Sequence, residues 1–175
     1  TLTLDAPLTC ALERELGGAT VQATLPRRVS ECGIESLTLE SEFDKSNPLD
    51  EEHAWQAIAL ESAEDCWVKG VTARHFVSSA VRVGEDSRRI TVQDCANLAP
   101  ISEVAGYRRH AFYTAGQQTL FLRCTSESAR HDFAVGWLAA GPNAFVQCTA
   151  KDSHSFSGPI ESWATGVLYD NLVLD

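Results

Sequence analysis

Short segments in which apolar and other residues alternate recur along the chain. One series has an apolar second position and lies at residues 57–60, 80–83, 111–114, 132–135 and 162–165. A second series lies between these segments, at residues 37–39, 71–73, 90–92, 120–122, 144–146 and 172–174. Alternation with a period of two is typical of β-strands. The pattern therefore predicts many short strands and no long helix.

The spacing of the first series favours a solenoid. Its apolar second positions are 58, 81, 112, 133 and 163, so successive segments lie 21 to 31 residues apart. In a β-helix each coil buries its apolar face against its neighbours, and loops of different length leave at the corners. An antiparallel sandwich also suits short strands with Gly-rich turns, but it does not require similar residues to recur at equivalent positions of successive segments. We predict an all-β fold, a right-handed single-stranded parallel β-helix of about six coils.

Length and composition set the limits of this fold. A chain of 175 residues suits one sizeable core, so we expect a single β-helix domain over residues 1–175. The chain has no methionine and opens on an alternating Thr-Leu pattern at residues 1–4. We therefore expect a processed protein or a module excised from a larger one.

Three cysteines each follow a strand of the second series. Cys95, Cys124 and Cys148 occupy equivalent places, and no cysteine belongs to a CxxC pair, so a zinc site is weakly supported. Small, easily buried thiols suit an internal stack. We predict a mostly reduced cysteine ladder, in preference to the disulfides that an even count permits, and we expect no metal and no cofactor.

Charge and hydropathy exclude two classes of partner. The formal net charge is −10 and the pI is about 4.9, so the protein repels phosphate backbones and we expect no nucleic-acid partner. No apolar run approaches the roughly 18 residues that a membrane-spanning helix needs, so we expect no membrane partner either.

Polar residues collect just before the first series of strands. Two places before the aligned apolar position stand Gln56, Ser79, His110, His131 and Glu161, and Arg109, Arg130 and Asp132 adjoin them. Parallel strands stack about 4.8 Å apart, so we expect one polar patch over successive coils. Such residues ordinarily cap strand ends. Neighbouring guanidiniums, however, are costly without a ligand or an acidic partner.

Aromatic residues complete the predicted ligand-binding site. Tyr107 precedes the basic run before one strand, and Trp137 follows another in a Gly-containing loop. Flat amphipathic rings suit sugars, whose faces are apolar and whose edges form hydrogen bonds. Trp163 aligns with Phe112 and Phe133, and we expect it in the core. The predicted ligand-binding residues are Tyr107, Arg109, His110, Arg130, His131, Asp132, Trp137 and Glu161.

From residue 33 to the end, the chain resembles the pectate-lyase-like β-helix superfamily of bacterial carbohydrate-active proteins. The resemblance is carried by the motifs at residues 33–39, 106–109, 130–133, 141–143 and 157–168. Within that superfamily it is most similar to β-helix modules of gut bacteria, including xylan-binding modules attached to xylanases. The resemblance implies a secreted, cell-surface or periplasmic bacterial protein joined to a catalytic domain.

One departure from the superfamily bears on function. Some relatives carry His-His-Arg after Ser-Gly-Pro, whereas this chain has Ile160, Glu161 and Ser162 there. The loss favours a non-catalytic carbohydrate-binding module for a plant cell-wall polysaccharide, xylan above all. Two enzyme alternatives stay open. One is a polysaccharide lyase using Arg109 or Arg130 with His131, and the other is a glycoside hydrolase using Asp132 and Glu161.

The last segment of the sequence also predicts a contact. Residues 171–175 read as a bare strand at one end of the solenoid. An unpaired strand edge invites pairing with another chain, so we expect either a partner chain, as in a homodimer through exposed solenoid ends, or a further capping segment to cover it.

Overall fold

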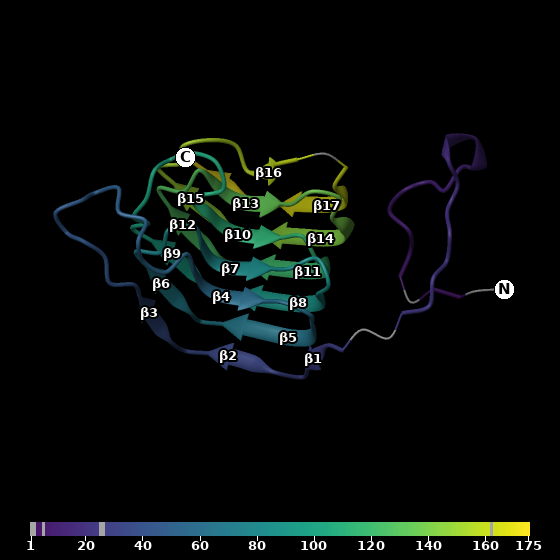
Figure 1. Ribbon diagram of the computed structural model, residues 1–175, viewed down its shortest axis with the longest axis horizontal. Helices are drawn as coiled ribbons and strands as arrows, with labels where there is room; N and C mark the ends of the chain where they lie inside the picture. Colours follow the sequence, from purple (N-terminus) through teal and green to yellow (C-terminus); the bar gives the residue numbers. More distant parts are fainter. Residues whose placement is uncertain (1–2, 5, 25–26, 162) are drawn as a thin grey trace.

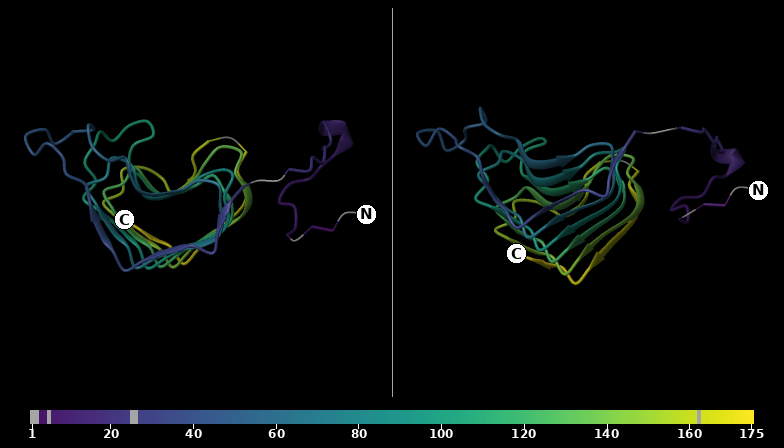
Figure 2. Two further views of the ribbon diagram at one scale, coloured as in Figure 1. Left: turned by 60° about the horizontal axis from the view of Figure 1, so that its bottom comes forward. Right: turned by 90° about the horizontal axis from the view of Figure 1, so that it is seen from below.

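A computed structural model describes residues 3–4, 6–24, 27–161 and 163–175. It confirms the predicted parallel β-helix, because all its strand pairs are parallel and the strands form three stacked sheets (Figure 1). Seen obliquely to the stack, successive coils follow nearly the same outline (Figure 2). Each complete coil adds one strand to each sheet.

The strands are as follows. Sheet A contains β1 (Val29–Ser30), β2 (Gly33–Glu35), β5 (Ala63–Lys69), β8 (Arg88–Gln93), β11 (Gln117–Leu122), β14 (Ala140–Val146) and β17 (Thr165–Asp170). Sheet B contains β3 (Thr38–Glu40), β6 (Thr72–Arg74), β9 (Ala96–Leu98), β12 (Thr125–Glu127), β15 (Thr149–Lys151) and β18 (Val173–Leu174). Sheet C contains β4 (Gln56–Leu60), β7 (Ser79–Val83), β10 (His110–Thr114), β13 (His131–Val135) and β16 (Gly158–Pro159).

The coils occupy less of the chain than the predicted 1–175. They run from β1 to β18, whereas the described residues before Val29 form a single short 3₁₀ helix, η1 (Arg14–Leu16), and no strand. This N-terminal segment lies to one side of the stack (Figure 1) and contacts it at β17, where the hydroxyl oxygens of Thr9 and Thr165 lie 2.8 Å apart. The alternating Thr-Leu pattern forms no strand at residues 3 and 4, and residues 1 and 2 lie outside the described part.

Four of the five predicted segments in the first series form sheet C, and the fifth prediction is wrong. Phe112 pairs with both Val81 and Phe133, as predicted. In the last coil, however, Ala134 pairs with Gly158, so that β16 takes the place expected for 162–165. Trp163 accordingly lies outside the core with 72% of its surface exposed, and Ser162 lies outside the described residues.

The second predicted series combines two sheets. Residues 90–92, 120–122 and 144–146 lie in sheet A, whereas residues 38–39, 72–73 and 173–174 lie in sheet B. The two sheets meet at a corner where one residue per coil has a left-handed backbone. Its φ is between 52° and 62° at every coil, at Ser36, Gly70, Asp94, Arg123, Gln147 and Asn171.

Stacked rings fill the interior beneath sheets A and C. Phe121 and Phe145 stack with centroids 4.7 Å apart, and Tyr169 continues the column at 5.2 Å. Phe112 and Phe133 stack at 5.9 Å under sheet C. These four phenylalanines are fully buried, and burial of each aromatic side chain stabilises the fold by roughly 1.5–3 kcal/mol. The apolar columns therefore hold adjacent coils in register.

The predicted stacking of three cysteines is confirmed. The register aligns Cys95, Cys124 and Cys148 in adjacent coils next to sheet B, and all three thiols are buried and unbridged. Hydrogen bonding and burial raise the pKa of the Cys124 thiol well above its usual range. Cys66 is also buried but belongs to another column, opposite Ile90.

In the described part of the chain, no helix is long and apolar enough to span a membrane.

Candidate functional site

The outer face of sheet C carries two adjoining pockets. Their volumes are about 250 and 260 Å³, and Tyr107 and His110 line both of them. His110 and Tyr113 of β10 line the first pocket, whereas the two residues between them, Ala111 and Phe112, belong to the core. Strand β10 therefore directs an imidazole and a phenol towards the pocket, while its middle residues anchor the coil.

The two pockets together form the sheet-C site. Trp55, Gln56, Ser78, Ser79, Arg82 and Tyr113 line only the first pocket. Gly106, Arg130, His131, Ser155, Phe156, Ile160 and Glu161 line only the second. The site thus spans several coils and combines aromatic rings, hydroxyls and cations, a mixture that suits a polar ligand with apolar faces.

The polar residues that precede the first series of strands form a column over successive coils, and its central pairs are predicted correctly. His110 pairs with His131, and Gln56 pairs with Ser79. Glu161 does not continue this column, because Val135, the last residue of β13, pairs with Pro159, so Glu161 lies beyond the paired strands. Glu161 instead approaches from the loop after β16 and accepts a hydrogen bond from the Tyr107 hydroxyl. It reaches the predicted neighbourhood by a different route.

The paired imidazoles form the floor of the site. Their ring centroids lie 5.1 Å apart, edge to face. His131 donates from Nδ1 to the carbonyl of Phe156 at 2.7 Å, because a carbonyl can only accept. That bond leaves its Nε2 as an acceptor. The buried Nε2 of His110 has no hydrogen-bond partner among the described residues. His110 is only 4% exposed, but it lines both pockets.

Both histidines are neutral at neutral pH. Burial, followed by the charge of His131, lowers the pKa of His110 to about 4. Burial also lowers the pKa of His131, while the bond to Phe156 partly opposes that shift. A neutral imidazole exchanges hydrogen bonds with a hydroxyl in either direction. The floor therefore suits a hydroxylated ligand.

The first pocket also contains residues that the sequence analysis does not select. Arg82 forms an ion pair with Glu61, and its guanidinium lies 5.5 Å from the centre of the Tyr113 ring. Trp55 is 39% exposed and lies beneath the guanidinium of Arg108, at 5.6 Å. The signal for Arg82 is a charged residue inside an otherwise apolar strand, which indicates an outward-facing position.

Five of the eight predicted residues line the site, and three do not. The five are Tyr107, His110, Arg130, His131 and Glu161. Arg109 instead supports a loop, donating to the carbonyl of Ser102 at 2.7 Å and to that of Ser128 at 3.1 Å. Trp137 lies on the turn after β13 with 61% of its surface exposed, away from both pockets.

Asp132 is the third residue outside the site. It is fully buried, and Oδ2 accepts a hydrogen bond from Ser153 at 2.7 Å. Asp132 and Glu161 line no common pocket, so the arrangement expected for a hydrolase pair is not seen. The described residues contain no group of three His, Cys, Asp or Glu side chains able to hold a metal ion.

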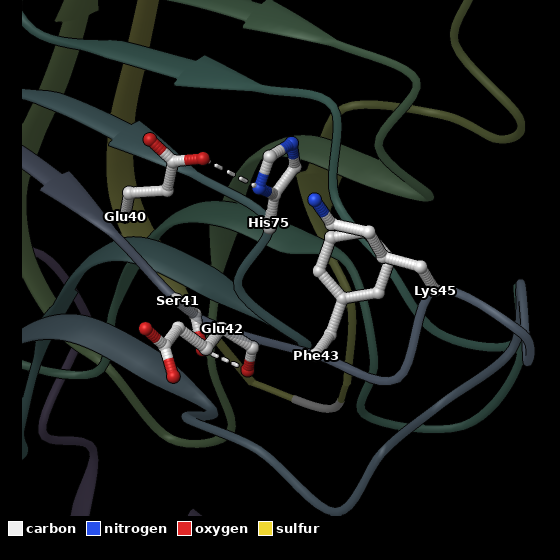
Figure 3. A pocket seen from close by; sticks show the side chains of 6 residues that line it. All are labelled: Glu40, Ser41, Glu42, Phe43, Lys45 and His75. Carbon is white, nitrogen blue, oxygen red and sulfur yellow. Dashed lines mark hydrogen bonds and ion pairs between the residues drawn. The ribbon is translucent and has the colours of Figure 1, made fainter.

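A larger pocket of about 580 Å³ lies beside the loop that follows β3 (Figure 3). His75 Nδ1 lies 3.4 Å from a carboxylate oxygen of Glu40. The ring of Phe43 packs edge-on against His75 at 5.0 Å. This aromatic ring thus packs the loop after β3 against the residue that follows β6 in the next coil.

Comparison with protein-family models, curated proteins and solved structures finds no match for this chain.

Proposed function

We propose that the sheet-C site binds a plant cell-wall polysaccharide, most favourably xylan, without cleaving it. The observation that carries the proposal is the unpartnered Nε2 of His110, buried where the two pockets meet. A buried polar atom without a partner costs about 1–3 kcal/mol. One sugar hydroxyl would satisfy it, and Tyr107 and Tyr113 would lie beside the ring.

The shape of the site supports a chain ligand. Two adjoining pockets on successive coils offer places for neighbouring sugar units along the solenoid. Trp55 borders one end and Phe156 the other. Aromatic rings supply apolar contact, while Gln56, Ser79 and the histidines supply hydrogen bonds, so each unit would meet both kinds of partner.

A polysaccharide lyase is the second candidate. Arg130 and His131 line the same pocket, and such an enzyme needs a cation for the uronate carboxylate and a base for the adjacent proton. Binding without cleavage is favoured because Arg109, the other predicted cation, supports a loop instead. Secretion and attachment to a catalytic domain belong to the same proposal.

Affinity electrophoresis tests this proposal. Native gels containing xylan, pectin or β-glucan would be run beside assays for new reducing ends and unsaturated uronates. We expect retardation in xylan and no product. Unsaturated uronates would establish the lyase, and unchanged mobility in all three glycans would overturn the proposal. Trp137→Ala serves as a control, because this exposed residue lies outside the site.

A further inference from the structure

The outer face of sheet A carries a separate pocket of about 500 Å³. Strands β2, β5 and β8 form it, and it shares no lining residue with the sheet-C site. The residues that matter here are Glu35, Asp65, Trp67, Lys69, Thr91 and Gln93.

The indole of Trp67 is held in a fixed position on this face. Its Nε1 donates to a carboxylate oxygen of Glu35 at 2.6 Å. The ring also lies against Gly33, where an added Cβ would come within 2.0 to 2.6 Å of three indole atoms. Glycine at this position therefore makes room for the ring. The side chain still has 38% of its surface exposed.

Polar side chains surround the indole in two rows that the strand register defines. Thr91 of β8 pairs with Trp67 of β5. In the second row, Lys69 of β5 lies between Glu35 of β2 and Gln93 of β8. Asp65 borders the pocket and forms a bidentate ion pair with Arg89, whose guanidinium nitrogens donate to the two carboxylate oxygens at 2.6 and 2.7 Å. A positioned aromatic ring beside hydroxyl, amide and charged groups matches both the faces and the edges of a sugar.

We propose that Trp67 and its neighbours form a second carbohydrate-binding site, which takes a sugar unit against the indole. The ligand class rests on the proposed function, but the site itself is independent of sheet C. Two sites on different faces would let one module engage two polysaccharide segments. Linked sites of this kind raise the overall avidity without any change in either single-site affinity.

Indole NMR signals provide a test that needs no change at Trp67. The Nε1–H signals of the ¹⁵N-labelled protein would be followed during titration with xylohexaose, in the wild type and in Tyr107→Ala. We expect the Trp67 signal to move saturably in both proteins. Trp163 is the internal control, because it is exposed on a loop and lines neither proposed site.

The outcomes separate the second site from the proposed function. A Trp67 shift that disappears in Tyr107→Ala would overturn the second site and leave the sheet-C site intact. A constant Trp67 signal with moving His110 signals would do the same. Constant signals from both regions would overturn both proposals.

A second experiment measures retention on insoluble xylan. Because linked sites gain avidity, Trp67→Ala should lower retention by about tenfold or more, and Trp163→Ala should not. Gly33→Ala should act in the same direction as Trp67→Ala, because its methyl group displaces the indole. Retention unchanged in both sheet-A variants would overturn the second site.

Discussion

The hydroxyl of Tyr107 donates a hydrogen bond to Glu161, 54 residues further along the chain. Tyr107 lies on the loop before β10, and Glu161 lies on the loop after β16. Their contact therefore joins two loops over the paired histidines of sheet C. The bond and the charge of Glu161 raise the pKa of the Tyr107 phenol, so that the proton stays on the tyrosine.

The first prediction concerns this bond. Tyr107→Phe removes the donor, and Glu161→Ala removes the acceptor. Each change should weaken xylohexaose binding about threefold to tenfold, because one hydrogen bond contributes about 0.5–1.5 kcal/mol. The double variant should lose little more than either single variant, since both remove the same contact. Glu161→Gln keeps an acceptor and serves as the control. Calorimetric titration measures all four, and additive losses would contradict the coupling.

The second prediction contrasts two phenylalanines. Phe133→Ala should lower the free energy of unfolding by about 3–5 kcal/mol, because this ring is fully buried against Phe112. Phe156→Ala should cost about 0.5 kcal/mol or less in stability, because the ring is 57% exposed. It should nevertheless weaken sugar binding, since Phe156 packs on His131 at 4.7 Å. Urea denaturation and titration test the contrast. Equal stability losses would contradict it.

The third prediction concerns the thiols. Cys10 and Cys32 are exposed, whereas Cys66, Cys95, Cys124 and Cys148 are buried. An aromatic disulfide reagent should therefore modify two thiols quickly in the native protein and all six in denaturant. If denaturant, without added reductant, exposes fewer than four further thiols, the buried cysteines contain a disulfide, which would contradict the reduced ladder.

The fourth prediction concerns pH. Burial lowers the pKa of His110 from 6.5 to about 4, so between these values the unfolded chain binds a proton that the folded protein does not. The stabilising effect of a neutral His110 is fully present above pH 6.5 and is lost as the pH falls towards 4. One such group contributes a slope of at most about 1.4 kcal/mol per pH unit.

Urea titrations at pH 4.5, 5.5 and 7 would measure this slope. His110→Gln should flatten the dependence between pH 4.5 and 6.5, because the amide does not titrate. An identical slope in the wild type and the variant would show that His110 is protonated equally in both states. His154→Gln is a matched control, because that histidine is exposed.

The strand pattern predicts the fold well where a coil has five-residue strands. Alternating residues around Val81, Phe112 and Phe133 align the coils correctly, and the pairing of His110 with His131 follows from them. The pattern does not identify the strand of the last coil, because β16 has two residues and no apolar alternation. Trp163 is a better match to the pattern than Gly158, although it does not occupy the column.

The pattern does not separate sheet B from sheet A, for a related reason. Sheet B has strands of two or three residues, too short to show a period of two. The corner before it needs a left-handed backbone, yet that position holds residues as different as Gly70, Arg123 and Gln147. Adjacent coils restrain this conformation through stacking, so no residue type marks it in the sequence.

Two of the predicted residues outside the site, Arg109 and Asp132, depend on features that the sequence does not show. Sequence position places Arg109 and Asp132 beside the histidines, but it does not specify which way each side chain points. The backbone turn at Arg109, with φ of 55°, and the burial of Asp132 are tertiary features. Glu161 shows the converse case, because a loop brings it to the site from outside the predicted column.

The most direct test of the sheet-C site follows the imidazole signals of His110 and His131 by NMR during titration with xylohexaose. The two signals can be assigned from His110→Gln and His131→Gln variants. We expect both signals to shift saturably with the same dissociation constant, with no new reducing ends in the sample. Constant imidazole signals throughout the titration would contradict it.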